Sequence, residues 1–94
     1  MKKFFNNVEE ILTESLSGFQ KAHPEIIKVH FAPDFICRVK KPAGDKVSLI
    51  SGGGSGHEPL HGGFVGHGML DAACPGQVFS APTPDQMEAA ANEV

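Results

Sequence analysis

The fold is decided by the stretch VSLISGGGSGHEP, which occupies residues 47–59. Its first part, Val47–Ile50, is a short and mostly apolar run of the kind that is buried in a parallel sheet. Three adjacent glycines follow at positions 52–54, and we expect them to form a loop that leads into a helix from Glu58 to about Val65. Pro59 suits the first turn of that helix, because the N–H that proline lacks has no helical partner there.

Two segments before this stretch have patterns of their own. Val8–Lys21 carries apolar residues at helical spacing, and Asn7 followed three residues later by Glu10 has the spacing of a capping box, so a first helix is predicted there. Ile26–Lys40 is strand-like but is broken by Ala32-Pro33-Asp34, which predicts two short strands around a turn. A second turn is expected at Pro42–Asp45.

The last part of the chain predicts a strand and a helix. Ala72–Ser80 reads as a strand that is interrupted or ended by Pro75-Gly76. Thr83-Pro84-Asp85-Gln86 has the order of a helix start: an N-cap, a proline at N1, an acid near the positive end and Gln at N3. The apolar face of this helix is predicted to consist of Met87, Ala90, Ala91 and Val94.

The order of these elements predicts an α/β fold, with helices packed in layers on a mainly parallel sheet. A chain of 94 residues forms one domain at most. The last helix has no capping residue before the sequence ends at Val94, and so small a sheet leaves its edges unpaired. We therefore expect residues 1–94 to be the N-terminal portion of a layered domain in a longer chain.

Composition excludes several classes of function. The formal net charge is −3 and no basic run is longer than two residues, so we expect no nucleic acid partner. No apolar run approaches the roughly 18 residues that cross a bilayer, so we expect no membrane partner. Cys37 and Cys74 are far apart and form no CxxC pair, which favours reduced thiols in a cytoplasmic protein. We expect both to be small buried side chains.

The candidate site lies between Ser51 and His67, because ligands bind outside the carboxyl ends of strands in open α/β sheets. Glycines let a ligand approach backbone N–H groups, although they can equally serve only a tight turn. His57 favours the functional interpretation, since an imidazole can accept or donate a proton near neutral pH. No metal ligand set and no cofactor bound by this segment are expected.

Familiar motifs do not fit this segment. No Lys follows Gly56, so it is not a P-loop, and its glycine spacing fits neither a dinucleotide fingerprint nor the GxSxG elbow. His57-Glu58-Pro59-Leu60-His61 matches the zinc motif HExxH by letter, but that motif needs a continuous helix, which Pro59 disrupts. His67 is available as a third zinc ligand, but nothing in its spacing supports that role.

The remaining titratable residues carry weaker signals. His61 and His67 lie among glycines, and a structural or surface role is the more frequent one for each. Asp71 is either an acidic residue near the site or part of an ordinary helix end formed by Gly68-Met69-Leu70-Asp71. His23 and His30 belong to no motif, and we expect both to be exposed.

Taken together, the motifs resemble one known family. The pattern SGGGSGHEP, followed by GxGML and then by a segment ending in PTPD, resembles the substrate-binding subunit of dihydroxyacetone kinases. The resemblance covers nearly the whole chain and is weakest from His30 to Lys41. It implies an α/β protein of glycerol metabolism that is usually a homodimer.

The resemblance also implies a chemistry. Family members hold dihydroxyacetone as a covalent hemiaminal on a histidine and transfer a phosphoryl group to it. The donor is ATP in one branch; in the phosphotransferase-linked branch it is ADP, held with Mg on a partner subunit and recharged there. Carried over by motif position, Gly54, Ser55, Gly56 and His57 contact the triose, with His57 as general base or orienting group. The hemiaminal histidine, a lysine and an aspartate are expected beyond Val94.

Two functions therefore remain open at this point. The first is a kinase subunit of which this segment carries part of the site and is inactive alone; the phosphotransferase-linked branch is the expected one. The second is a non-catalytic relative that binds dihydroxyacetone and acts as a transcriptional coactivator. We also expect Gly54→Val to block the site without unfolding the sheet.

Overall fold

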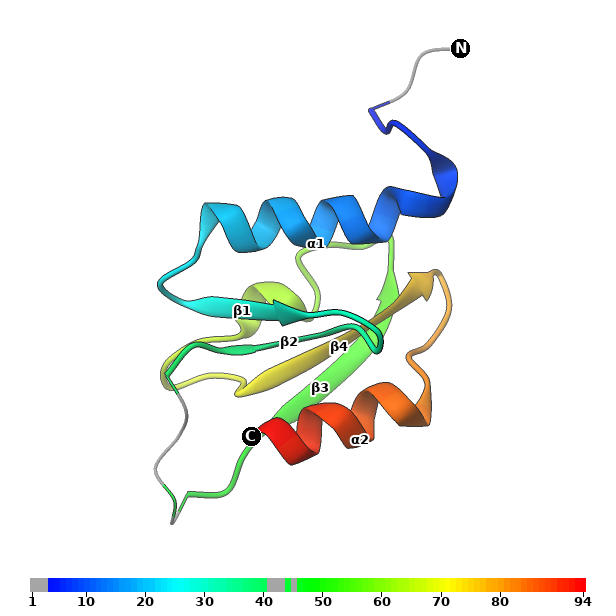
Figure 1. The fold of residues 1–94 in the computed structure, drawn as a ribbon. Helices are drawn as coiled ribbons and strands as arrows, with labels where there is room; N and C mark the ends of the chain where they lie inside the picture. The colour runs from blue at the N-terminus through cyan, green and yellow to red at the C-terminus, as the bar shows by residue number, and fades with distance from the viewer. Residues whose placement is uncertain (1–3, 41–43, 45) are drawn as a thin grey trace.

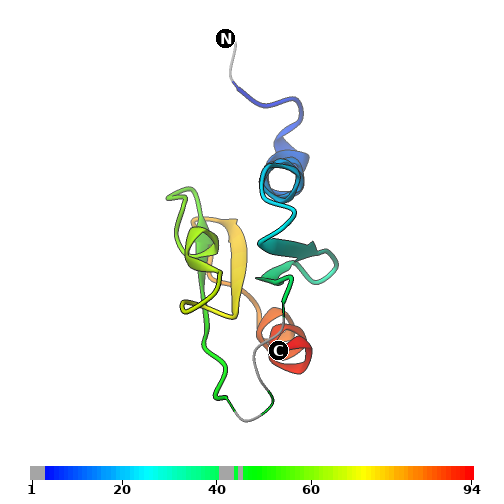
Figure 2. The same ribbon diagram turned by 90° about the vertical axis from the view of Figure 1, so that its left-hand side faces the viewer.

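The computed structural model describes residues 4–40, 44 and 46–94. Within these residues, a four-stranded sheet in the order β1-β2-β4-β3 lies between two α-helices (Figure 1). In the view turned by 90°, α1 and α2 lie on opposite sides of the β1–β2 hairpin (Figure 2). Along the chain the elements are η1 (Val8–Glu10), α1 (Ile11–Ala22), β1 (Ile27–His30), β2 (Phe35–Arg38), β3 (Ile50–Ser55), η2 (Gly62–Phe64), β4 (Ala72–Val78) and α2 (Pro84–Glu93).

The N-terminal half follows the sequence prediction except at the start of its helix. The side chain of Asn7 accepts a hydrogen bond from the N–H of Glu9 at 2.9 Å, not from Glu10 as a capping box requires, and the 3-10 turn η1 precedes α1. The predicted pair of short strands is the antiparallel hairpin β1–β2, in which Ile27 is paired with Arg38. The turn predicted at Pro42–Asp45 lies outside the described residues, apart from Gly44.

The α/β class is confirmed, but the sheet is less parallel than expected. β3 and β4 pair in parallel, whereas β1 with β2 and β2 with β4 pair antiparallel. A parallel pair needs a crossover connection of about a dozen residues or more. Among the described strands that are both neighbours in the sheet and consecutive in the chain, only β3 and β4 have a connection of that length. The short turn between β1 and β2 permits only an antiparallel hairpin.

The position of β3 corrects the prediction for the glycine stretch. The strand does not lie at Val47–Ile50, where Val47 is 82% and Leu49 is 56% exposed, but runs through the glycines as Ile50–Ser55. A Cβ on Gly52 would lie 2.8 Å from the carbonyl oxygen of Cys74 on β4. The missing side chains thus let β3 lie close to its neighbours, and the expected loop is a strand.

The connection from β3 to β4 also differs from the prediction. No α-helix forms at Glu58–Val65; turns cover the first residues and the 3-10 helix η2 spans only Gly62–Phe64. Each helix-interior glycine costs about 1 kcal/mol relative to alanine, and Gly62-Gly63 places two of them side by side. The pattern that predicted a helix is therefore outweighed by its glycines.

β4 continues through Pro75-Gly76 to Val78, where an interruption or end was expected. Ala73 is the last residue of β4 that pairs with β2, opposite Ile36. Among the described strands, only β3 pairs with the residues of β4 after Ala73. A proline is tolerated on a strand side that needs no ladder hydrogen bond. The proline therefore does not end the strand.

The start of α2 is confirmed in detail. Thr83 Oγ1 accepts from the N–H of Gln86, and the Gln86 side chain accepts from the N–H of Thr83, which completes a capping box. The buried face of α2 differs in part from the prediction. Ala90 is buried as expected, but Ala91 is exposed, and Gln86, which was not predicted on this face, is buried.

Two apolar clusters occupy the two faces of the sheet. Along β2, Ile36 faces α1 while Phe35 and Cys37 face α2, as expected from the alternation of side chains in a strand. The cluster under α1 consists of Leu12, Leu16, Ile27, Val29, Ile36, Val65 and Ala73. The cluster under α2 consists of Phe35, Cys37, Ala72, Cys74 and Ala90, so both cysteines are buried, as predicted. Among the described residues, no helix is long and apolar enough to cross a membrane.

Candidate functional site

The candidate site lies at the carboxyl end of β3, where two imidazoles converge over one glycine. A Cβ built on Gly53 would lie 2.9 Å from Nε2 of His61 and 3.8 Å from Cε1 of His57. The rings of His57 and His61 are 6.5 Å apart between centroids and stand at 86° to each other. The space left by the absent side chain of Gly53 is thus bordered by both histidines.

His61 has a fixed position in this arrangement. Its Nδ1 shares a hydrogen bond of 3.1 Å with the hydroxyl of Ser51, which lies on β3 two residues before Gly53. The ring is half-buried, whereas His57 is exposed to solvent. We call Ser51, Gly53, His57, Glu58 and His61 the histidine site.

The turn that carries His57 is held from two sides. Gly56 has a φ of +115°, a conformation that side chains other than glycine rarely adopt. Its N–H donates to both carboxylate oxygens of Glu58, at 3.1 and 3.3 Å. A Cβ on Gly56 would lie 3.0 Å from the ring of Phe79, so the aromatic ring covers the other side of the turn.

Two of the predicted site residues, Gly54 and Ser55, pack against β4 and the segment that follows it. The Ser55 hydroxyl donates to the carbonyl of Gly76 at 2.8 Å, and the residue is only 5% exposed. A Cβ on Gly54 would lie 2.8 Å from the backbone nitrogen of Ser80. The expectation that Gly54→Val leaves the sheet intact conflicts with this packing, because the new side chain would meet backbone that cannot swing aside.

The sequence interpretation missed four members of the histidine site. Gly53, Ser51, Glu58 and His61 were not among the predicted site residues. His61 was visible in the sequence as the second histidine of the HExxH pattern, and Ser51 as the residue before the glycines. The contact of His61 with Ser51 and Gly53 depends on the path of the chain after residue 56. That path is not the predicted helix, and no local sequence pattern indicates it.

Asp71 lies at the opposite end of the sheet from His57. It precedes β4 and is completely buried, with its carboxylate 2.8 Å from Arg38 Nη1, 3.0 Å from Lys46 Nζ and 2.8 Å from the Leu49 nitrogen. Burial alone would raise the pKa of this carboxyl, but the Leu49 N–H and the contacts with Arg38 and Lys46 outweigh it. Together they lower the pKa from 3.8 to about 2. The group is an ionised part of the framework.

The other histidines lie outside the histidine site. Arg38 Nη2 donates to Nδ1 of His67 at 3.4 Å, which joins this residue to the buried ion pair with Asp71. His23 is exposed, as predicted. His30 is half-buried instead, because its ring stacks on Phe35 with centroids 4.3 Å apart.

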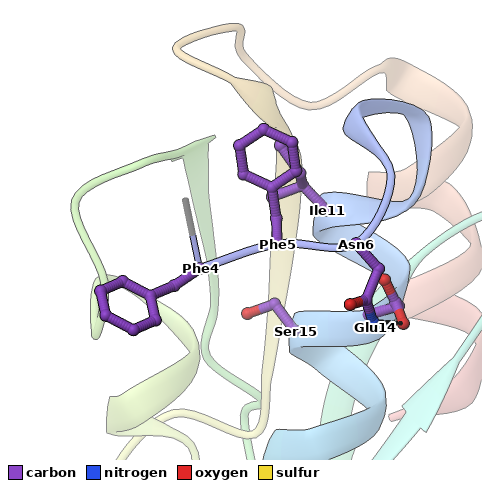
Figure 3. Close-up of a pocket in the computed structure, with 6 residues that line it drawn as sticks. All are labelled: Phe4, Phe5, Asn6, Ile11, Glu14 and Ser15. Carbon is purple, nitrogen blue, oxygen red and sulfur yellow. Dashed lines mark hydrogen bonds between the residues drawn. The ribbon is translucent and has the colours of Figure 1, made fainter. Parts of the chain in front are cut away.

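Two hollows lie outside the His57–His61 pair, although Glu58 lines one of them. One, of about 600 Å³, lies between the N-terminal segment and α1, and Figure 3 shows Phe4 pointing away from that helix there. The other, of about 280 Å³, is apolar and lies between α1 and the segment Glu58–Leu60. Among the described residues, no three His, Cys, Asp or Glu side chains gather closely enough to hold a metal ion.

The chain is similar to known proteins along most of its length. The family described as the Dak1 domain matches residues 17–94. The dihydroxyacetone-binding subunit DhaK of the PEP-dependent dihydroxyacetone kinase of Escherichia coli (strain K12) is 49% identical over 94 residues, which is 100% of this chain and 26% of that protein.

Two solved structures are similar in fold and sequence. The dihydroxyacetone kinase from C. freundii, in complex with AMP-PNP and Mg²⁺, gives a TM-score of 0.88 at 35% identity, over 99% of this chain and 18% of that one. The dihydroxyacetone kinase operon co-activator Dha-DhaQ gives 0.73 at 34% identity, over 94% of this chain and 26% of that one. The chain thus spans about a quarter or less of the length of these proteins.

Proposed function

Because the chain belongs to the family described as the Dak1 domain, we propose that it forms one wall of the dihydroxyacetone site of a dihydroxyacetone kinase. The observation that carries the proposal is the exposed imidazole of His57 at the carboxyl end of the glycine strand β3. This is the end of a strand at which ligands bind in α/β sheets.

His57 is the proposed general base or orienting group. As a triose hydroxyl oxygen forms its bond to phosphorus and the donor's own bond to that phosphorus breaks, the hydroxyl proton passes to the imidazole. The turn that carries His57 is held by Glu58 and covered by Phe79, which fixes the backbone from which the ring projects. A base that is already oriented loses less entropy when the substrate binds.

The glycines are proposed to bind the triose through their backbone. Dihydroxyacetone is small and uncharged, so N–H groups that approach it without intervening side chains suit its oxygens. Gly54, Ser55 and Gly56 lead directly to His57, and the Ser55 hydroxyl is already bonded to Gly76. We therefore assign any contact of Ser55 with the triose to its main chain.

The histidine site offers few ligands for Mg²⁺. Mg²⁺ takes oxygen ligands, and the Glu58 carboxylate, which also accepts the N–H of Gly56, is the one carboxylate in this site. The remaining groups are two imidazoles and the Ser51 hydroxyl, which is bonded to His61. We propose that ADP or ATP and its Mg²⁺ belong to a nucleotide-binding partner subunit or domain.

Further parts of the proposal rest on the family alone. Residues 1–94 are the N-terminal portion of the dihydroxyacetone-binding domain, and that domain is completed by a histidine, a lysine and an aspartate beyond Val94. The protein acts in the cytoplasm, in glycerol metabolism, as a homodimer. Its phosphoryl donor comes through the phosphotransferase system.

One comparison bears on a second function. The operon co-activator is 34% identical to this chain, close to the 35% of the C. freundii kinase, although the E. coli kinase subunit is 49% identical. A non-catalytic dihydroxyacetone-binding protein that acts as a transcriptional coactivator would use the same glycine strand and His57. Turnover is what separates these functions.

The test uses the complete protein that carries this chain, with a nucleotide-bearing kinase subunit and dihydroxyacetone. We expect turnover, and a loss of roughly 10²- to 10⁴-fold in kcat for His57→Ala. The matched control is His23→Ala, which removes an exposed histidine at the end of α1 and leaves turnover unchanged. Triose binding without turnover in the unmodified protein would favour the coactivator, and full turnover in a folded His57→Ala variant would overturn the role of His57.

A further inference from the structure

We infer that His61 is a positioning residue, which acts on the reaction by holding the imidazole of His57 in its working orientation. This inference rests on the proposed function and adds a second histidine to it. It also gives the second histidine of the HExxH pattern a proposed role other than zinc binding. The argument has three steps, which concern the anchor of His61, its contact with Gly53 and its relation to His57.

The first step is the anchor. His61 is tied by its Nδ1 to the Ser51 hydroxyl at 3.1 Å, and Ser51 belongs to the same strand as Gly53. The ring is half-buried, so both packing and a hydrogen bond fix it. The Ser51 hydroxyl can donate to Nδ1 or accept from it, so the bond holds the ring in place with either tautomer of His61.

The second step is the contact with the strand. Nε2 of His61 lies 2.9 Å from the point where a Cβ of Gly53 would stand. Only glycine leaves room for the imidazole at this distance, because real Cβ atoms do not approach other heavy atoms so closely. The ring therefore fills the space of a side chain that the strand lacks, and it does so next to the end of the strand.

The third step is the relation to His57. This side chain is exposed, and the recorded ring contact that it makes is with His61, edge to face, at 6.5 Å between centroids. Cε1 of His57 lies 3.8 Å from the same Cβ point of Gly53. The His61 ring thus forms a side wall that restricts the rotation of His57, and without it the general base would sample more orientations.

The sharpest test is a double-mutant cycle on His57 and His61 in the complete protein, with kinase turnover as the readout. His61→Ala alone is expected to lower kcat by roughly 10- to 100-fold, the size of effect that misplacement of a catalytic group produces. In the His57→Ala background, His61→Ala is expected to change kcat little further, because the group on which it acts is absent.

Ser51→Ala provides a milder variant that deletes only the hydroxyl. We expect a smaller loss of kcat in the same direction and no further loss when it is combined with His61→Ala. If His61→Ala fails to fold, Ser51→Ala combined with His57→Ala completes the same cycle. His61→Asn, whose amide can still bond to Ser51, is expected to recover part of the kcat that alanine loses.

The outcomes separate this inference from the proposed function. If His57→Ala is fully active, the proposed role of His57 fails and the inference fails with it. If His57→Ala loses activity while the effects of His57 and His61 multiply independently, the base assignment stands and the positioning role is overturned. A second readout is NMR of the His57 imidazole without substrate. The ring should become more mobile in His61→Ala, and an unchanged signal would contradict the inference.

Discussion

The imidazole of His61 occupies the space that a side chain of Gly53 would fill, with Nε2 2.9 Å from the position of the missing Cβ. Gly52 and Gly54 differ from Gly53 in what a Cβ would meet. On these two residues it would meet backbone atoms, the oxygen of Cys74 and the nitrogen of Ser80, each at 2.8 Å. The three adjacent glycines therefore have separable roles.

Alanine substitutions in this series are expected to act differently. Gly53→Ala meets the His61 side chain and no backbone, so it should displace the ring from its hydrogen bond with Ser51 and lower kinase turnover, with a smaller loss of stability than Gly54→Ala. Gly54→Ala meets Ser80 backbone, so it should destabilise the fold by roughly 1–3 kcal/mol, as overpacking does. Chemical denaturation and turnover, measured on both variants of the complete protein, check this. Equal losses of stability would contradict it.

Loss of the buried carboxylate of Asp71 is expected to be costly. Asp71→Asn leaves Arg38, which is 9% exposed, without its ionised partner. Breaking a buried ion pair by removing one member typically costs roughly 3–5 kcal/mol. The free energy of unfolding, measured by denaturant titration, should fall by about this amount. Glu88→Gln, an exposed change on α2, serves as the control and should leave the value unchanged.

The same carboxylate predicts an acid limit to stability. The pKa of Asp71 is lowered to about 2 in the folded protein, against an ordinary value of 3.8. Its contribution to stability is therefore fully present above about pH 4 and is lost as the pH falls through 2. The difference in unfolding free energy between the unmodified protein and Asp71→Asn should narrow over this window. A difference that stays constant between pH 5 and pH 2 would contradict the assignment.

Loss of the Gln86 side chain is expected to lower stability more than loss of the helix cap that it helps to form. Its Nε2 donates to the carbonyls of Asp34 at 2.8 Å and of Pro75 at 2.7 Å, and so it ties α2 to the hairpin and to β4. Gln86→Leu leaves both oxygens without this donor and should cost more than Thr83→Ala, which loses about 1 kcal/mol of capping energy. Thermal unfolding of the two variants compares them directly, and a milder effect of Gln86→Leu would be contrary evidence.

Features that depend on neighbours in sequence could be predicted from the sequence. The capping box of Thr83 and Gln86 and the short hairpin at Ile27–Arg38 form between residues a few positions apart. Their geometry follows from hydrogen bonds and turns within one segment, so the local pattern is sufficient. The glycine stretch and His57 were also identified as the candidate site from the residues alone, and the role assigned to them remains a proposal.

Features that depend on distant neighbours were decided only by the tertiary structure. The glycines form a strand because β4 and the segment after it lie against them, which no local propensity encodes. Asp71 is a framework anion because the sheet brings Arg38, 33 positions away in sequence, to its carboxylate. The meeting of His61 with Ser51 depends likewise on the turn after Gly56. The sequence by itself determined much of the local structure and the place of the candidate histidine, His57, in the chain. Close packing between elements decided which side chains meet, because van der Waals fit and buried charge depend on atoms that only the folded chain brings together.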